Sequence, residues 1–471
     1  MTKKFYVTTA IDYVNAKPHI GHAFEKTLAD TLARWHRLKG DKVWFLTGTD
    51  ENAQKNSQAA KEAGIPVRKF VDENSKIFIE LCKKLNLTND DFIRTTEERH
   101  IKVATEIIKK VYIKGDIYKK NYEGLYCYGC ESYKTEKDLV NGKCPEHPNR
   151  EISVLKEDAY FFKLSKYKTK IEKFVKDYIV PESRKKEILS RLKEDELKDL
   201  CITRKNSEWG IDFPIDKNFK VYVWFDALIN YISGAGKNWP ADLHIVGKGI
   251  NWFHSVIWPA ILISADYELP KKLLVHGYLN LQGQKISKSL GNVIDPFVLV
   301  DKYGADAVRY SLLRCSVFED SDFSEEILIQ RNNNELADKL GNLISRVSTL
   351  AEKYEIEKCE NKLLKKLKLK EIEKYFENYE TDKALIEIFA FVDVCNEYVQ
   401  NKQPWKSGDK KVLYELCDSI KAISILLSPF IPSASEKIAK QFDFEINLKE
   451  IEKPLKENKI KKSEILFKKI I

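Results

Sequence analysis

The fold is decided by residues 5–50, which read FYVTTAIDYVNAKPHIGHAFEKTLADTLARWHRLKGDKVWFLTGTD. Residues 5–10 form a short β-branched and aromatic run, which is typical of a buried parallel strand. A turn through Asn15–Pro18 leads into a helical pattern from about His19 to Lys39. A second strand is expected at residues 42–47. This strand–helix–strand order predicts an α/β fold with a doubly wound parallel sheet of the Rossmann type.

The rest of the chain continues this pattern with one interruption. From residue 116 to 216, short strands, turns and a cysteine cluster replace it, which indicates a domain inserted into the sheet. The α/β pattern resumes at Lys220–Phe225, and after about residue 325 the Lys- and Glu-rich amphipathic segments predict a helical bundle. The expected domains are residues 1–115 and 217–325 for the two halves of the sheet domain, 116–216 for the insertion and 326–471 for the bundle.

Composition excludes several classes of protein. Of the 471 residues, 43% are hydrophobic and 32% are charged, so the chain can bury sizeable cores and does not resemble a disordered protein. The longest nearly apolar run, residues 256–265, is shorter than the about 20 residues that a membrane span needs, and the N-terminus lacks a signal-peptide core. We therefore expect a cytoplasmic protein. The net charge of +9 permits a nucleic-acid partner without requiring one.

The first candidate functional motif is Pro18-His-Ile-Gly-His22, at the start of the expected helix. A helix N-terminus offers unpaired N–H groups and a partial positive charge, which suit a phosphate. Two imidazoles three residues apart can flank that phosphate, and Gly21 allows a nucleotide to approach the backbone closely. The alternative is that both histidines only cap the helix.

The second motif is Gln284-Lys-Ile-Ser-Lys-Ser-Leu-Gly291, which is expected to form a loop after a strand. Its two lysines can meet the negative charge that develops on a leaving pyrophosphate. A single loop of this composition could equally be an ordinary solvent-exposed segment. Together, in this order on one α/β scaffold, the two motifs are more specific than either alone.

The third motif is a cysteine cluster. Cys127-Tyr-Gly-Cys130 is followed after thirteen residues by Cys144-Pro-Glu-His147. Paired ligands at this spacing are typical of tetrahedral zinc, and three cysteines with one histidine form a closed, structural set. The alternative is four residues without a metal. Nine cysteines in a chain of this length do not indicate a disulfide framework.

These motifs resemble the signatures of a known enzyme family. The first two are similar to the His-Ile-Gly-His and Lys-Met-Ser-Lys-Ser motifs of class I aminoacyl-tRNA synthetases. The remainder, from Phe5 nearly to the last residue, resembles the methionyl-tRNA synthetases within that class. The similar segments are residues 5–9, 45–50, 91–100, 222–228, 275–278 and 301–309.

The resemblance implies a two-step reaction. ATP and L-methionine would give methionyl-adenylate and pyrophosphate, and the methionyl group would then pass to the 3′ end of tRNA(Met). His19 and His22 would hold the phosphates, and Lys285 and Lys288 would stabilise charge on the pyrophosphate. Mg²⁺ would accompany ATP. The implied ATP-binding residues are His19, Gly21, His22, Glu25, Lys285 and Lys288.

The resemblance also implies a methionine pocket. Asp50 could pair with the α-ammonium group, while Trp224 and Tyr13 would wall an apolar slot for the thioether. Aromatic contacts to sulfur contribute about 0.3–1.5 kcal/mol each. Read without the family, Trp224 and Tyr231 are expected core residues. The positions that match the family's methionine contacts are Ala10, Ile11, Tyr13, Asp50, Trp224, Ala227, Tyr231, Ile250 and His254.

The C-terminal segment resembles the family's anticodon-binding bundle. Asn342 and Arg346 are one helical turn apart and match its anticodon-reading Asn and Arg. Trp405 matches its base-stacking Trp, and splayed single-stranded bases are read by such stacking and by edge hydrogen bonds. Without the resemblance, the Asn and Arg would be ordinary surface residues. The family's zinc knuckle lies in the inserted domain beside the active site.

The chain departs from the family pattern at several positions. Asn52 and Ala53 stand where the family commonly has His-Gly, and Gly249 stands where it usually has an Asp near the nucleotide ribose. Ile286 replaces the Met of the lysine motif, a change that is similar in volume. Because the chain ends soon after the bundle, we expect a monomer. Two alternatives stay open: another class I synthetase or nucleotidyltransferase, and a paralogue that binds tRNA without catalysis.

Overall fold

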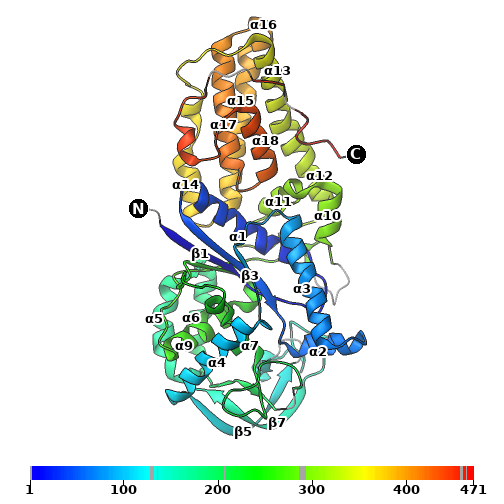
Figure 1. Ribbon diagram of the computed structural model, residues 1–471, viewed down its shortest axis with the longest axis vertical. Helices are drawn as coiled ribbons and strands as arrows, with labels where there is room; N and C mark the ends of the chain where they lie inside the picture. Colours follow the sequence, from blue (N-terminus) through cyan, green and yellow to red (C-terminus); the bar gives the residue numbers. More distant parts are fainter. Residues whose placement is uncertain are drawn as a thin grey trace.

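The computed structural model describes residues 3–127, 132–134, 136–205, 207–285, 293–456, 460–462 and 464–470. Figure 1 shows an elongated molecule with a helical bundle at one end and the sheets toward the other, with α1 and β1 between them. Within these ranges no helix is long and apolar enough to cross a membrane.

A parallel sheet forms the centre of the N-terminal part. Its strands run in the order β2-β3-β1-β12-β13-β8, with β4 paired to β3, and all of these pairings are parallel. The chain leaves β1 toward β3 on one side and later adds β12 on the other, so the switch point of the sheet lies between β1 and β12. This confirms the predicted doubly wound sheet. The strands are β1 (Lys4–Thr9), β2 (Asp12–Tyr13), β3 (Lys42–Asp50), β4 (Asp91–Arg94), β8 (Ile179–Val180), β12 (Leu243–Gly247) and β13 (Leu273–His276).

Helix α1 (Ile20–Leu38) makes the first crossover of this sheet and packs on β1 and β3. Residues 5–9 of β1 are all buried, which explains why the strand lacks an alternating polar pattern. The crossover brings the first turn of α1 to the carboxyl end of β1. The other helices of this part are α2 (Gln54–Glu62), α3 (Val67–Lys84), α4 (Glu98–Ile113), α8 (Asn230–Ser233), α9 (Trp258–Ser264), α10 (Pro296–Tyr303) and α11 (Ala305–Leu313).

The inserted segment has a sheet of its own. Strands β5 (Ile117–Cys127) and β7 (Ser153–Phe162) pair antiparallel over ten positions, flanked by β6 (Ser132–Lys134) and β9 (Leu200–Cys201). Helices α5 (Lys168–Tyr178) and α6 (Glu182–Glu194) follow β7. Between these two helices, β8 returns to the parallel sheet and pairs with β13, so the insertion is tied to the sheet it interrupts.

The prediction that the parallel sheet resumes at Lys220–Phe225 was wrong. Only Lys220 and Val221 form a strand, β11, and it pairs antiparallel with β10 (Thr203–Arg204) instead of joining the parallel sheet. The next residues form helix α7 (Val223–Ala227), and the parallel sheet resumes at β12. A short apolar run is buried equally well in a strand or in a core helix, so its pattern does not separate the two.

Helices dominate the C-terminal part, as predicted. A small sheet joins β14 (Leu279–Leu281) to β15 (Gln284–Lys285) and β16 (Ser321–Asp322), and no described residue after β16 lies in a strand. The helices that follow are α12 (Glu325–Arg331), a π-helical segment (Asn332–Gly341), α13 (Asn342–Tyr354), α14 (Leu369–Glu377), α15 (Thr381–Lys402), α16 (Pro404–Ser407), α17 (Lys410–Leu427) and α18 (Pro432–Phe442).

A buried arginine joins the bundle to the sheet part. Arg309 of α11 is fully buried and pairs with Asp30 of α1, with 2.7 Å between Nη1 and Oδ2. The ring of Trp35 on α1 also stacks on Phe376 of α14, with 3.9 Å between the ring centroids. The bundle is therefore fixed to α1. The guanidinium group of Arg309 donates to the main-chain oxygens of Leu85, Pro429 and Phe430.

Candidate active site

A cavity of about 510 Å³ lies at the carboxyl edge of the parallel sheet, and we call it the central cavity. It brings together residues 10–13 after β1 and within β2, the first turns of α1, the ends of β12 and β13 with residues that follow them, and Trp224 of helix α7. From the predicted ATP-binding set it includes His19, Gly21, His22 and Glu25. From the predicted methionine set it includes Ala10, Ile11, Tyr13, Trp224 and Ile250. A larger hollow of about 790 Å³ beside α6 shares Glu146 and Gly249 with it.

The two histidines at the start of α1 are oriented by the helix backbone. His19 Nδ1 accepts a hydrogen bond from the N–H of Gly21 at 3.1 Å, and His22 Nδ1 accepts from the N–H of His19 at 3.0 Å. A neutral imidazole that accepts at Nδ1 carries its proton at Nε2. The ring centroids lie 3.9 Å apart. The helix-cap interpretation is therefore correct for the Nδ1 atoms, while the Nε2–H groups suit a phosphate.

A buried ion pair lies below these histidines. Lys26 of α1 is fully buried and pairs with Asp12 of β2, which also lies 3.8 Å from Nε2 of His22. Burial alone would lower the pKa of Lys26, but Asp12 and Glu25 outweigh it and the pKa is raised. The lysine is therefore charged, and it neutralises a carboxylate that would otherwise repel a phosphate. Neither Asp12 nor Lys26 was predicted from the sequence.

Glu25 and His276 form a second polar pair in the cavity wall. His276 Nε2 lies 3.0 Å from Glu25 Oε2, and Nδ1 lies 2.7 Å from the main-chain oxygen of Gly277. Both nitrogens of His276 face oxygens, so its imidazole connects the carboxyl group of Glu25 with the main chain after β13. His276 is a cavity residue that the sequence analysis did not single out, although its strand was recognised.

Aromatic rings form the wall at the predicted methionine pocket. Tyr13 meets Trp224 edge-on, with 6.3 Å between the ring centroids, and Trp224 stacks on Phe253 at 3.8 Å. Behind this wall, Tyr231 and His254 are buried and joined by a 2.7 Å hydrogen bond from the hydroxyl group to Nε2. The predicted residues Asp50, Ala227, Tyr231 and His254 are buried near this wall but do not line the cavity.

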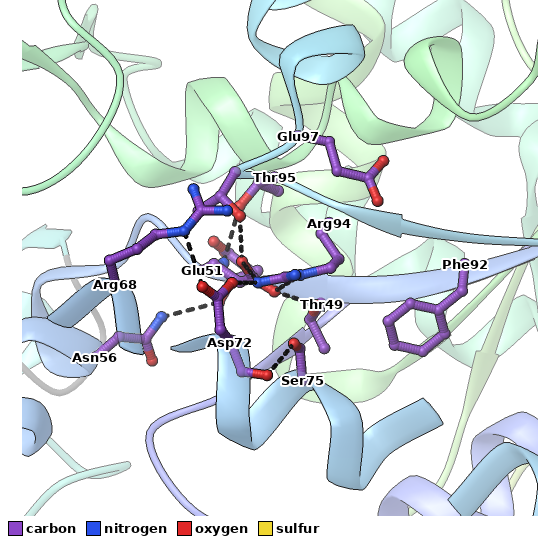
Figure 2. Close-up of polar contacts among 12 residues, drawn as sticks. Thr49, Glu51, Asn56, Arg68, Asp72, Ser75, Phe92, Arg94, Thr95 and Glu97 are labelled. Atoms are coloured by element: carbon purple, nitrogen blue, oxygen red, sulfur yellow. Dashed lines mark hydrogen bonds and ion pairs between the residues drawn. The ribbon is translucent and has the colours of Figure 1, made fainter. Parts of the chain in front are cut away.

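The carboxyl end of β3, which carries Asp50, is held by the network in Figure 2. The buried carboxylate of Glu51 accepts from Arg94 at 2.7 and 2.9 Å and from the hydroxyl of Thr49 at 2.8 Å. Arg94 also pairs with Asp72 of α3. Burial opposes the charge of Arg94, but Glu51 and Asp72 raise its pKa. This clamp fixes the residue that follows Asp50.

Asn52, one of the departures from the family pattern, has a defined partner. Its Nδ2 donates to Asp226 Oδ2 at 2.8 Å and to the main-chain oxygen of Thr95 at 3.1 Å. The other oxygen of Asp226 lies 2.6 Å from Nε2 of His100. Because Asp226 belongs to α7, Asn52 connects the segment that follows Asp50 to the helix that carries Trp224.

The cysteine cluster borders the central cavity. One ligand atom each from Cys127, Cys144 and His147 lies within 4.8 Å of the other two, and both cysteines are buried. Soft thiolate sulfurs and an imidazole at this separation suit a zinc ion. Cys130, the fourth predicted ligand, lies outside the described residues. His147 also lines the cavity, so the knuckle forms part of its rim.

A separate hollow of about 640 Å³ lies in the bundle, and we call it the bundle hollow. It brings together the three predicted anticodon residues, Asn342, Arg346 and Trp405. The guanidinium carbon of Arg346 lies 6.0 Å from the ring centroid of Trp405, and this ring is 37% exposed. An exposed indole beside a cation suits stacking by an unpaired base.

Comparison with known proteins identifies the family. The profile described as "tRNA synthetases class I (M)" matches residues 5–153 and 148–348, and that of the "Anticodon-binding domain of tRNA ligase" matches residues 360–470. The methionine–tRNA ligase of Clostridium acetobutylicum is 41% identical over 99% of this chain and 78% of its own length. The chain belongs to the methionyl-tRNA synthetase family.

Other members of the methionyl-tRNA synthetase family match equally well. The methionine–tRNA ligase of Thermotoga maritima is 42% identical over 97% of this chain and 77% of its own length, and that of Rickettsia conorii is 41% identical over 94% and 93%. The methionyl-tRNA synthetase of Mycobacterium tuberculosis, solved in complex with methionyl-adenylate, superimposes with a TM-score of 0.94 at 34% identity and covers 99% of this chain and 100% of that one.

The lysine motif of this synthetase is described only at its first residues. The backbone of Lys285 belongs to β15, which pairs with β14 directly after the cavity residue Tyr278. The side chain of Lys285 and the whole of Lys288 lie outside the described residues. Their approach to His19 and His22 therefore stays a prediction.

Proposed function

We propose that this member of the methionyl-tRNA synthetase family charges tRNA(Met) with methionine in two steps on one site. The methionine carboxylate attacks the α-phosphorus of ATP, which gives methionyl-adenylate and pyrophosphate. The terminal adenosine of the tRNA then takes the methionyl group. The observation that supports this proposal is that His19 and His22 line the same cavity as Tyr13 and Trp224.

In this proposal the chain contributes mainly positioning and electrostatic stabilisation. The Nε2–H groups of His19 and His22 donate to the phosphates at the positive end of α1. Lys285 and Lys288 stabilise the negative charge that develops on the leaving pyrophosphate. Mg²⁺ is expected to bind together with ATP.

The methionine slot is proposed to select its substrate by shape and by the absence of charge. Asp50 binds the α-ammonium group, while Tyr13 and Trp224 enclose the thioether. Behind them, the neutral pair of Tyr231 and His254 is fully hydrogen-bonded and adds no charge to the slot. The remaining proposed contacts are Ala10, Ile11, Ala227 and Ile250.

One zinc ion is proposed for the cysteine knuckle, held by Cys127, Cys130, Cys144 and His147. Zinc with four protein ligands has no open position, so its role is structural. It would stabilise the part of the cavity rim that includes His147. Elemental analysis of the purified chain is expected to give one zinc per molecule.

The bundle hollow is proposed to read the anticodon, with Trp405 stacking on a base and Asn342 and Arg346 contacting base edges. We propose the division into residues 1–115, 116–216, 217–325 and 326–471 for the two catalytic halves, the insertion and the bundle. We also propose that the protein acts as a monomer in the cytoplasm.

ATP–pyrophosphate exchange tests the proposed function. Methionine is expected to drive exchange, and leucine, isoleucine and valine are expected to be much poorer substrates. Exchange driven by another amino acid would indicate a different class I synthetase. Absence of exchange together with binding of tRNA would indicate the non-catalytic paralogue.

A further inference from the structure

Tyr278 reaches across the turn that follows β12. Gly247, at the end of β12, is the register partner of His276 in β13, and Tyr278 stands two residues beyond His276. A Cβ at Gly249 would lie 2.0 Å from the Tyr278 hydroxyl oxygen and 3.4 Å from the ring carbon that bears it. The main-chain N–H of Gly249 donates to the same hydroxyl. The Tyr278 hydroxyl can therefore lie here only because residue 249 is a glycine and has no side chain.

The tyrosine is fixed in this place by two neighbours. The N–H of Tyr278 donates to Asp320 Oδ1 at 2.9 Å, and Lys248 donates to both oxygens of Asp320 at 2.8 and 2.7 Å. Lys248 Nζ also lies 4.8 Å from the centroid of the Tyr278 ring. Burial, together with the charge of Glu146, raises the pKa of Tyr278, so the hydroxyl keeps its proton at neutral pH.

The hydroxyl lies on the part of the cavity wall that the other ligand groups leave for the nucleoside. Phosphates belong at the N-terminus of α1, and the amino acid belongs between Tyr13 and Trp224. Nucleotides bound at such sheets extend from the helix N-terminus across the switch point to the neighbouring strands. The cavity wall after β12 and β13 includes Gly247, Gly249 and Tyr278. The two glycines leave room for a sugar, and the tyrosine supplies a polar group.

We propose that the hydroxyl of Tyr278 holds the ribose of ATP through a hydrogen bond to a ribose hydroxyl. It would thereby take the place of the carboxylate that the family pattern has at residue 249. A phenol hydroxyl can donate and accept at the same time, so a hydrogen bond with a ribose hydroxyl is compatible with the one from Gly249. This inference rests on the proposed function, because it assumes that ATP occupies the central cavity.

The first test compares Tyr278→Phe with the wild type in ATP–pyrophosphate exchange. Loss of one hydrogen bond is expected to raise KM for ATP by about 3- to 10-fold and to leave KM for methionine unchanged. Tyr112→Phe, on α4 and 40% exposed, is the matched control and should change neither constant. A KM for ATP within twofold of the wild type in Tyr278→Phe would overturn the proposal.

The second test uses the steric link between residues 249 and 278. Gly249→Ala places a methyl group against the hydroxyl oxygen, so it should raise KM for ATP in the wild-type background. In Tyr278→Phe the nearest ring atom is 3.4 Å away, so the added methyl group should then have little further effect. Gly249→Asp combined with Tyr278→Phe is expected to recover part of the ATP affinity. Additive effects of the two single changes would contradict the proposal.

Nucleotide analogues identify the contacted group. The wild type should bind either 2′-deoxy-ATP or 3′-deoxy-ATP more weakly than ATP, because one of them lacks the contacted hydroxyl. Tyr278→Phe should bind that analogue and ATP with similar affinity. Equal discrimination in both proteins would place the ribose elsewhere. Dissociation constants from calorimetry need no turnover, so they test Tyr278 even if methionine fails to drive exchange. In that event the proposed reaction would fail while the ribose contact could still be confirmed.

Discussion

His254 is held uncharged by its surroundings. Its Nδ1–H donates to the main-chain oxygen of Ile250 at 2.9 Å, and its Nε2 accepts from Tyr231. Burial lowers the pKa of His254 to about 4. An imidazolium at this place would attract water and anions into the methionine slot, so a neutral ring suits an apolar substrate.

This low pKa makes stability depend on pH. In the unfolded chain His254 takes up a proton below about pH 6.5, whereas in the folded chain it does so only near pH 4, so acidification favours unfolding. Between pH 7.5 and 5.5 this residue should cost the wild type about 1 kcal/mol of unfolding free energy. The unfolding free energy of His254→Gln, measured by urea denaturation, should fall by correspondingly less over the same pH interval. The same pH dependence in both proteins would contradict this assignment.

At the scale of single residues, sequence spacing predicted groups that are close in the chain and missed groups that only folding brings together. His19 and His22 were recognisable because both lie within one helical turn. Asp12 and Lys26 are fourteen residues apart and meet because the chain turns between β2 and α1. Nothing local marks such a pair, although Lys26 lies one turn beyond His22 on the same face of a buried helix.

The loop between β3 and α2 depends on a clamp from neighbouring elements. Arg94→Met would leave the buried carboxylate of Glu51 without its cation, and such losses typically cost about 3–5 kcal/mol. Because this loop directly follows Asp50, KM for methionine should rise as well. Arg99→Met is the matched control, since Arg99 is 44% exposed in its ion pair with Asp91 and should contribute less than about 1 kcal/mol.

Urea denaturation and pyrophosphate exchange on both variants measure these effects. If Arg94→Met and Arg99→Met lost similar unfolding free energy, the clamp would be no more than a surface ion pair.

At the scale of elements, the sequence predicted the helices and strands whose ends are marked by proline or glycine. The ends of β1 and α1 were expected within one residue of their observed positions, because Pro18 and Gly40 mark the helix on both sides. Strand β3 begins where it was expected and continues three residues farther, to Asp50. The segment Lys220–Phe225 was misjudged because its five apolar and aromatic residues fit a strand or a core helix. Its helical form depends on tertiary partners such as Asn52, which binds Asp226.

The two hollows lie in different parts of the molecule, so their functions should separate by mutation. Trp405→Ala is expected to raise KM for tRNA by about 5- to 100-fold, which corresponds to the loss of one base stack. Methionine-dependent pyrophosphate exchange should be unchanged, because the central cavity is untouched. Lys406→Ala, at the exposed neighbouring residue, is the control for a local charge effect. A matching rise in KM for tRNA in the control would argue against stacking.

At the scale of the whole molecule, the sequence predicted a bundle but not how it attaches. Amphipathic patterns identify which face of a helix is buried and not what covers it. The attachment depends on Arg309, whose charge gave no indication of full burial, and on carbonyl groups that follow α17. Such a contact between distant segments becomes visible only in three dimensions.

The attachment of α1 also constrains how this protein can be divided or exchanged. Its first turn presents His19 and His22, while Asp30 and Trp35 farther along face the bundle. A fragment cut off before α14 would expose the indole of Trp35 and deprive Arg309 of the oxygens of Pro429 and Phe430. The two parts are therefore interdependent, and a bundle borrowed from a relative would require matching replacements along one side of the catalytic helix.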